Sequence, residues 1–199
     1  MIILKILFWA SLGAILWTHL GYPLFVTALA AVRRKRVAKE DIAPSVAVVV
    51  AAHNEEAVIG RLVESLLAQD YPGELEVVVA SDASTDSMDA LVEQIAQRDG
   101  RVRLVRCPRG GKVAAQNLAV RTVGADVVAF ADAGAVWEPA ALRKLVRSLA
   151  DPHVGYVAGK VSFGEPEGTN REGLYWRYEL WLRGRESAAG SITGGNGAI

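Results

Sequence analysis

The chain has 199 residues, of which 51% are hydrophobic and 22% are charged, a composition that supports one catalytic-size domain with a buried core. Lysine plus arginine and aspartate plus glutamate number 22 each, so the net charge gives no reason to expect nucleic acid as a partner. The single cysteine, Cys107, excludes an internal disulfide framework and a thiolate cluster for zinc. Partners therefore have to be inferred from local features.

Residues 1–32 form an apolar segment that we interpret as a transmembrane helix. No Asp, Glu, Lys or Arg stands between Lys5 and Arg33, and this run is longer than the about 20 residues that a membrane span requires. Four basic residues follow at 33–36, and the positive-inside rule places the chain beyond them in the cytoplasm. We therefore expect a protein of the cell (inner) membrane with its catalytic domain on the cytoplasmic side.

Two alternatives for this segment stay open. A signal peptide cleaved near residues 28–30 would also begin with an apolar run, although a run of this length followed by four cations argues against it. Gly21 and Pro23 allow a re-entrant pair of short helices instead of one tilted span.

Beyond a basic juxtamembrane linker at residues 33–45, the sequence alternates between two hydrophobic patterns. Continuous runs rich in β-branched residues predict buried strands at 46–52, 75–80, 102–107 and 126–130. Apolar residues at helical spacing predict helices over about 58–67, 88–95, 112–123 and 139–149. This alternation predicts an α/β domain at residues 46–199, with a mainly parallel sheet and helices on both faces.

Two further elements are predicted near the end of the chain. Residues 154–163 have the pattern of another strand, and residues 172–187 that of an amphipathic helix with an aromatic face. The aromatic residues of this helix have two interpretations: they stack on a sugar or polymer, or they pack in the core or at the headgroup level of a membrane. They are Tyr175, Trp176, Tyr178 and Trp181. We expect the acids of the helix, Glu179 and Glu186, to be solvated or salt-bridged.

Polar residues follow each of the four predicted strands. In an open parallel sheet, ligands bind outside the carboxyl ends of the strands, where these residues meet. They are His53, Asn54 and Glu55, then Asp82, then Arg109 to Lys112, and finally Asp132. The Gly110–Gly111 pair lets backbone amides approach a phosphate closely. Acids, a lysine and glycines at one rim predict a site for a phosphorylated ligand with a metal.

Several of these residues also have a purely structural interpretation. Asn54 and Asp86 are favoured N-cap residues for the helices that follow them. Asp82 stands too early to cap the next helix, and too many residues separate Asp132 from the helix near Glu138. A capping role therefore remains open for Asn54 and Asp86, whereas a ligand-binding role is favoured for Asp82 and Asp132.

Two common nucleotide motifs are absent from the sequence. A Walker A loop before Lys112 would need glycine where Arg106 stands and Ser or Thr where Val113 stands. The dinucleotide fingerprint G-x-G-x-x-G is missing after the first strand. P-loop, nicotinamide and flavin chemistry are therefore disfavoured.

Four blocks in this order are similar to successive blocks of the family 2 glycosyltransferases with the GT-A fold. They are "VAVVVAAHNEEAVIGRLVESLLAQDYP", "VVVASDASTD", "RGGKVAAQN" and "VVAFADAGAVWEPAAL", within a resemblance that covers residues 44–199. The resemblance implies a Rossmann-like GT-A sheet and inverting transfer from a nucleotide-sugar donor, a UDP-sugar, to a polysaccharide or lipid-linked acceptor. With its membrane segment, the chain resembles poly-N-acetylglucosamine, hyaluronan and cellulose synthases.

The resemblance also implies a role for individual positions. Ala52 and Glu55 would contact the uridine, Asp82 the uracil, and Lys112 the nucleotide, while Asp132 and Ala133 match the first two positions of the D-x-D motif. In the family this motif binds Mg²⁺ or Mn²⁺ on the diphosphate, but its third position is Gly134 here. One acid can be enough, because phosphate oxygens and water supply most ligands of such a cation.

The catalytic base is expected beyond Ile199, because in the family it follows a glycine-rich turn that residues 193–197 resemble. The sequence thus resembles a C-terminally truncated fragment, which we expect to bind a nucleotide without turnover. Two alternatives stay open: a non-catalytic, membrane-anchored nucleotide-binding or scaffolding protein, and a nucleotidyltransferase.

Overall fold

The computed structural model describes residues 1–33, 37–160, 170–190 and 192. These fall into two compact units, one containing the N-terminal helices with the last helix and the other containing the sheet.

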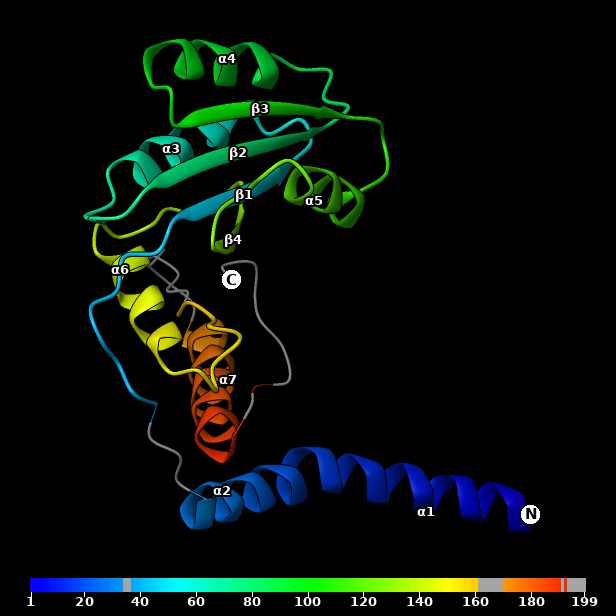
Figure 1. Ribbon diagram of the computed structural model, residues 1–199. Helices are drawn as coiled ribbons and strands as arrows, with labels where there is room; N and C mark the ends of the chain where they lie inside the picture. The colour runs from blue at the N-terminus through cyan, green and yellow to red at the C-terminus, as the bar shows by residue number, and fades with distance from the viewer. Residues whose placement is uncertain (34–36, 161–169, 191, 193–199) are drawn as a thin grey trace. The chain divides into compact units, whose positions relative to one another are not determined.

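The second unit is built on a parallel sheet of four strands (Figure 1). The strands are β1 (Val46–Ala52), β2 (Leu75–Asp82), β3 (Val102–Cys107) and β4 (Val127–Asp132), and their order across the sheet is β3-β2-β1-β4. The register pairs Ala52 with Ser81, Asp82 with Cys107, and Ala51 with Asp132. The predicted parallel sheet is confirmed, and all four carboxyl ends lie at one edge.

Helices cover both faces of this sheet, as predicted. The helices are α3 (Glu56–Leu67), α4 (Met88–Arg98), α5 (Lys112–Val120) and α6 (Ala141–Val146), which continues into a 3₁₀ turn at Arg147–Ala150. Successive side chains of a strand point to opposite faces, so β1 divides its valines between two cores. Val48 and Val50 join the core with α3, α4 and α6, whereas Val49 joins the core with α5.

Two predicted boundaries and one predicted strand differ from the structure. β2 and β4 continue to Asp82 and Asp132, so these two acids are the last residues of their strands. The strand predicted at 154–163 is wrong over residues 154–160, which form no strand, and residues 161–163 lie outside the described residues. Gly155 and Gly159 weaken a strand, and this backbone pairs with none of the described strands.

The first unit contains one long apolar helix that could cross a membrane by length and composition. It runs over Ile2–Arg33, 32 residues, through α1 (Ile2–Leu16), a π-helical turn (Trp17–Gly21) and α2 (Tyr22–Arg33). The π-turn accommodates Pro23, which has no N–H to donate to the preceding turn. The structure therefore has a continuous helix, not the re-entrant pair. The last helix, α7 (Asn170–Ala189), packs against α2.

The burial of α3 generates a stability prediction. Leu62 is 0% exposed between the sheet and its neighbours, whereas Val113 on α5 is 68% exposed. We expect Leu62→Ala to lower the free energy of unfolding of the sheet unit by about 2–5 kcal/mol, because it leaves a cavity in a close-packed core. The control Val113→Ala should stay within about 0.5 kcal/mol. Urea unfolding followed by circular dichroism measures both, and equal losses would contradict this description of the core.

Candidate functional site

The carboxyl edge of the sheet brings most of the sequence-predicted site residues to one rim. Ala52, Asp82 and Asp132 end β1, β2 and β4, and Lys112 opens α5 beyond the end of β3. Glu55 is the exposed N-cap residue of α3. Ala52 and Ala133 are buried, so any ligand contact from either is made by the backbone or a methyl group. The rim thus carries acidic side chains and a lysine next to buried alanines.

Asp82 is the most highly connected residue of this rim. Its Oδ1 accepts the backbone N–H of Gly110 at 2.7 Å, and its Oδ2 accepts the backbone N–H of Gly111 at 3.0 Å. The guanidinium of Arg109 donates to the same Oδ2 at 2.7 Å. These donors, with Gly110 contributing most, hold the pKa of the Asp82 carboxyl below its ordinary value, although burial opposes them. The carboxylate therefore fixes the loop between β3 and α5.

The two glycines are required by this arrangement. Gly111 has a φ of 83°, in the left-handed region that side chains disfavour, and a Cβ at Gly110 would lie 2.9 Å from the Cβ of Ala114. Both N–H groups are directed at Asp82. In this structure the two amides bind a carboxylate of the protein, and their approach to a phosphate stays a prediction.

His53 connects the ends of two strands, a role that the sequence analysis did not identify. Its Nδ1 lies 2.9 Å from the carbonyl oxygen of Asp82. Because a carbonyl can only accept, the ring carries its proton on Nδ1 in this contact. The imidazole thereby ties the residue after β1 to the last residue of β2.

The loops after β1 and β2 are cross-linked by their polar side chains. Asn54, with a φ of 55°, does not cap α3; its Oδ1 accepts the N–H of Thr85 at 2.7 Å. Asp86 accepts the N–H of Met88 in α4 at 3.2 Å and that of Glu56 in α3 at 3.0 Å. The capping interpretation is thus wrong for Asn54, whereas Asp86 binds first-turn amides of two helices.

Lys112 and Asp132 form an ion pair across the rim. The Nζ of Lys112 donates to the Oδ1 of Asp132, and both side chains are 51% exposed. Beyond Asp132 the chain turns tightly, with the N–H of Ala135 donating to the Asp132 carbonyl at 2.9 Å. A Cβ placed on Gly134 would meet nothing within 4 Å. The rim therefore presents the Lys112–Asp132 pair to solvent, beside open space at Gly134.

The donor set at this rim fits a cation shared with a ligand rather than a preformed metal site. Within the described part of the chain, no three His, Cys, Asp or Glu side chains are grouped so as to hold a metal ion. Asp132 offers one accessible carboxylate. Mg²⁺ is commonly held in this way, by one or two carboxylates together with phosphate oxygens and water.

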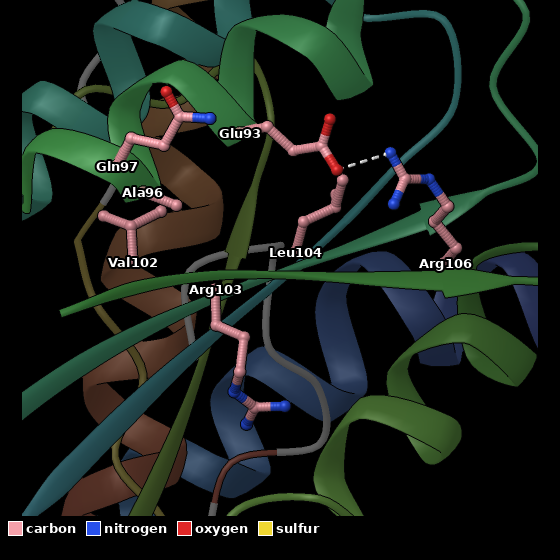
Figure 2. A pocket seen from close by; sticks show the side chains of 7 residues that line it. All are labelled: Glu93, Ala96, Gln97, Val102, Arg103, Leu104 and Arg106. Carbon is pink, nitrogen blue, oxygen red and sulfur yellow. Dashed lines mark hydrogen bonds and ion pairs between the residues drawn. The ribbon is translucent and has the colours of Figure 1, made fainter. Parts of the chain in front are cut away.

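A separate hollow lies at the edge of the sheet, between α4 and β3. This pocket of about 440 Å³ is lined by Glu93, Ala96, Gln97, Val102, Arg103, Leu104 and Arg106. Figure 2 shows Glu93 reaching Arg106 across its mouth, a hydrogen bond of 2.7 Å, while Arg103 points to the other side of β3. None of the predicted site residues lines this pocket. It is therefore distinct from the rim at the strand ends.

Residues 47–196 match the model of the family described as Glycosyl transferase family 2. The chain is 39% identical over 116 residues to a beta-monoglucosyldiacylglycerol synthase of Synechocystis sp., a match that covers 56% of this chain and 24% of the synthase. It is 33% identical over 124 residues to an N-acetylglucosaminyltransferase of Bradyrhizobium elkanii, covering 60% of this chain and 68% of that relative.

A solved structure agrees with these sequence relatives. The chain is similar to the mannosyltransferase PcManGT from Pyrobaculum calidifontis in complex with GDP-Man and Mn²⁺, with a TM-score of 0.63 and 35% sequence identity. The match covers 71% of this chain and 44% of the mannosyltransferase. The chain thus spans about a quarter of the Synechocystis synthase and less than half of the mannosyltransferase.

The environment of Asp82 generates a pH prediction. A carboxyl whose pKa is lowered by folding contributes stability above its unfolded pKa and loses that contribution as the pH falls through the folded pKa. We therefore expect wild type to be more stable than Asp82→Asn at neutral pH, and the difference to begin to shrink below about pH 4 and to disappear only once the pH has fallen through the lowered pKa of Asp82. Urea midpoints measured across the acid range give this difference. Asp70→Asn, at a largely exposed acid, is the control. A difference independent of pH would contradict the role of the Asp82 charge.

Proposed function

The chain belongs to glycosyl transferase family 2, and on that basis we propose that its rim binds a UDP-sugar for inverting transfer to a polysaccharide or lipid-linked acceptor. In such a transfer an acceptor hydroxyl attacks the anomeric carbon, the nucleoside diphosphate leaves, and a carboxylate takes the proton. The proposal covers the residues that bind the donor. Family membership also favours this function over a nucleotidyltransferase.

The observation that carries the proposal is the exposed pair of Lys112 and Asp132 at the carboxyl edge. A diphosphate needs positive charge, and a divalent cation needs negative charge. A diphosphate that arrives with its cation supplies both, so the ammonium can turn to a phosphate oxygen while the carboxylate turns to the cation. The mannosyltransferase with GDP-Man and Mn²⁺ supports this expectation of a divalent cation. We propose Mg²⁺ or Mn²⁺, with Asp132 as its protein ligand.

Asp82 supports uracil as the base of the donor. A carboxylate has about four acceptor positions, and three donors already occupy positions on Asp82. One position remains, which suits the single N–H that uracil presents, whereas guanine would present two. Glu55 and Ala52 would border the uridine from the end of β1. We therefore propose a UDP-sugar, although the similar mannosyltransferase was obtained with GDP-Man.

The long apolar helix supports a membrane location. We propose that it anchors the chain in the cell membrane with the sheet unit in the cytoplasm, because the basic residues follow it directly. A lipid-linked acceptor agrees with the name of the beta-monoglucosyldiacylglycerol synthase that the chain resembles.

Nucleotide binding tests the proposed site. We expect UDP to bind more tightly with Mn²⁺ than without it, and Asp132→Ala to remove this difference. Asp82→Ala should lower the affinity for UDP at least about tenfold, whether or not Mn²⁺ is present. This is the effect of losing one charge-assisted hydrogen bond. Isothermal titration calorimetry on the purified chain measures both, with GDP as the competing nucleotide. Glu138→Ala, at an exposed acid beyond the rim, is the control. Unchanged affinity in both variants would refute the site.

The open space at Gly134 allows a gain-of-function test. Because a Cβ at position 134 meets nothing within 4 Å, Gly134→Asp can add the second acid of a D-x-D motif without a clash at its Cβ. We expect this variant to bind Mn²⁺ with UDP more tightly, about tenfold, since a second carboxylate joins the coordination. Calorimetric titration of Mn²⁺ into the UDP-loaded protein gives the affinity.

The matched control is Gly124→Asp, which adds the same charge at another glycine with open space. A general effect of negative charge would raise Mn²⁺ affinity equally in both variants. If Gly134→Asp binds no better than Gly124→Asp, the cation does not lie beside residue 134.

A further inference from the structure

One face of α7 is left uncovered within its unit. Leu174, Tyr178, Trp181 and Arg185, which we name the α7 stripe, are spaced four, three and four residues apart and so share one face of the helix. All four are exposed, with Trp181 at 43% and Leu174 at 64%. Glu186, which was expected to be solvated or salt-bridged, is buried and not solvated, and it accepts a hydrogen bond from Tyr22 of α2.

The stripe is preorganised by contacts among its own side chains. The rings of Tyr178 and Trp181 stack with their centroids 6.0 Å apart, and the guanidinium of Arg185 lies 5.7 Å from the centroid of Trp181. Apolar ring faces thus stand beside a cation at the surface. Such a combination of Trp, Tyr and Arg is characteristic of side chains at the boundary between acyl chains and headgroups.

The length of the N-terminal helix places α7 at this boundary. Thirty-two residues at about 1.5 Å each extend well beyond a hydrocarbon core of about 30 Å, which needs about 20 residues. α1 has no buried residue, whereas α2 buries Pro23, Val26 and Ala30. When α1 and the π-turn fill the hydrocarbon, α2 begins at headgroup depth. α7 is the helix that packs on α2 there.

We propose that α7 is an interfacial helix whose stripe inserts into the headgroup layer of the bilayer beside the anchor, with Arg185 directed at anionic lipid phosphates. The rings of Tyr178 and Trp181 would lie at the acyl boundary, where Trp and Tyr side chains are favoured. This inference rests on the proposed membrane anchor but not on the proposed sugar transfer.

A sugar polymer is the rival occupant, and the chemistry of the stripe disfavours it. Sugar hydroxyls require acceptors as well as aromatic faces. The described acids of α7 are engaged elsewhere: Glu179 pairs with Arg183 at 2.9 Å, and Glu186 is buried against Tyr22. The stripe itself offers no carboxylate or amide side chain. A lipid surface, which presents acyl chains and phosphates, matches its composition better.

Spin-label accessibility in the full chain tests this placement. The chain has one cysteine, the buried Cys107, so Cys107→Ala gives a background for single labels. Nitroxides would be attached in Trp181→Cys and Tyr178→Cys, and as matched control in Ser187→Cys, an exposed position on the opposite side of α7. Electron paramagnetic resonance compares collision with oxygen, which concentrates in lipid, against collision with a water-soluble nickel chelate, in nanodiscs of phosphatidylcholine and phosphatidylglycerol.

We expect the ratio of oxygen to nickel accessibility to be several times higher at positions 178 and 181 than at position 187. Equal ratios at the three positions would overturn the proposal. So would a label at 181 that is inaccessible to both reagents, because another protein surface, such as a second copy, would then cover the stripe. Nickel accessibility at 181 that falls only when a glycan acceptor is added would assign the stripe to the acceptor instead.

Discussion

The geometry of the rim depends on how Asp82 is held at the end of β2. A buried carboxylate is tolerated only when it is well paired, and here two backbone amides and a guanidinium surround it. Those donors all belong to the loop after β3. Through them Asp82 fixes where α5 begins, and hence where Lys112 stands relative to Asp132. The acid at one strand end thus positions the cation at another.

This arrangement explains why two glycines precede Lys112. Gly111 adopts a backbone conformation that a side chain would strain, and Gly110 has no space for a Cβ. The two N–H groups converge on one carboxylate because the backbone turns sharply between them. The two glycines therefore allow the loop before α5 to bind Asp82. Lys112, the residue after them, is the part that faces solvent.

The fold was predictable from sequence to the extent that its signals are local. Apolar runs located all four strands, because β1 and β2 are buried along most of their length and β3 and β4 are partly buried. The segment at 154–160 shows the limit: an apolar run is a strand only when another strand is available to pair with it. Strand ends were harder to place, and the shift of two residues in β4 put Asp132 inside the strand.

The candidate site was predictable as a set of residues but not as a set of contacts. The topology rule for parallel sheets brought Asp82, Lys112 and Asp132 to one rim. It could not tell that Asn54 binds the loop after β2 instead of its own helix, because the partner, Thr85, is distant in sequence. His53 was placed at the rim, but its contact was not predicted, because its partner is a backbone carbonyl that carries no sequence signal.

The reduction of the D-x-D motif to one acid has a thermodynamic consequence. In the proposed site, with Gly134 in the third position, the carboxylate of Asp132 would be the protein's contribution to the cation, and it is paired with Lys112 in this structure. A free cation must displace an ammonium and gains only one carboxylate. A bound diphosphate would draw the Lys112 ammonium away from Asp132, and its oxygens would become further ligands of the cation. Because the coupling between two ligands is reciprocal, the cation would raise the affinity for the nucleotide by the same factor by which the nucleotide raises the affinity for the cation. In the proposed site, a single acid paired with a lysine would therefore couple binding of the cation to binding of the donor.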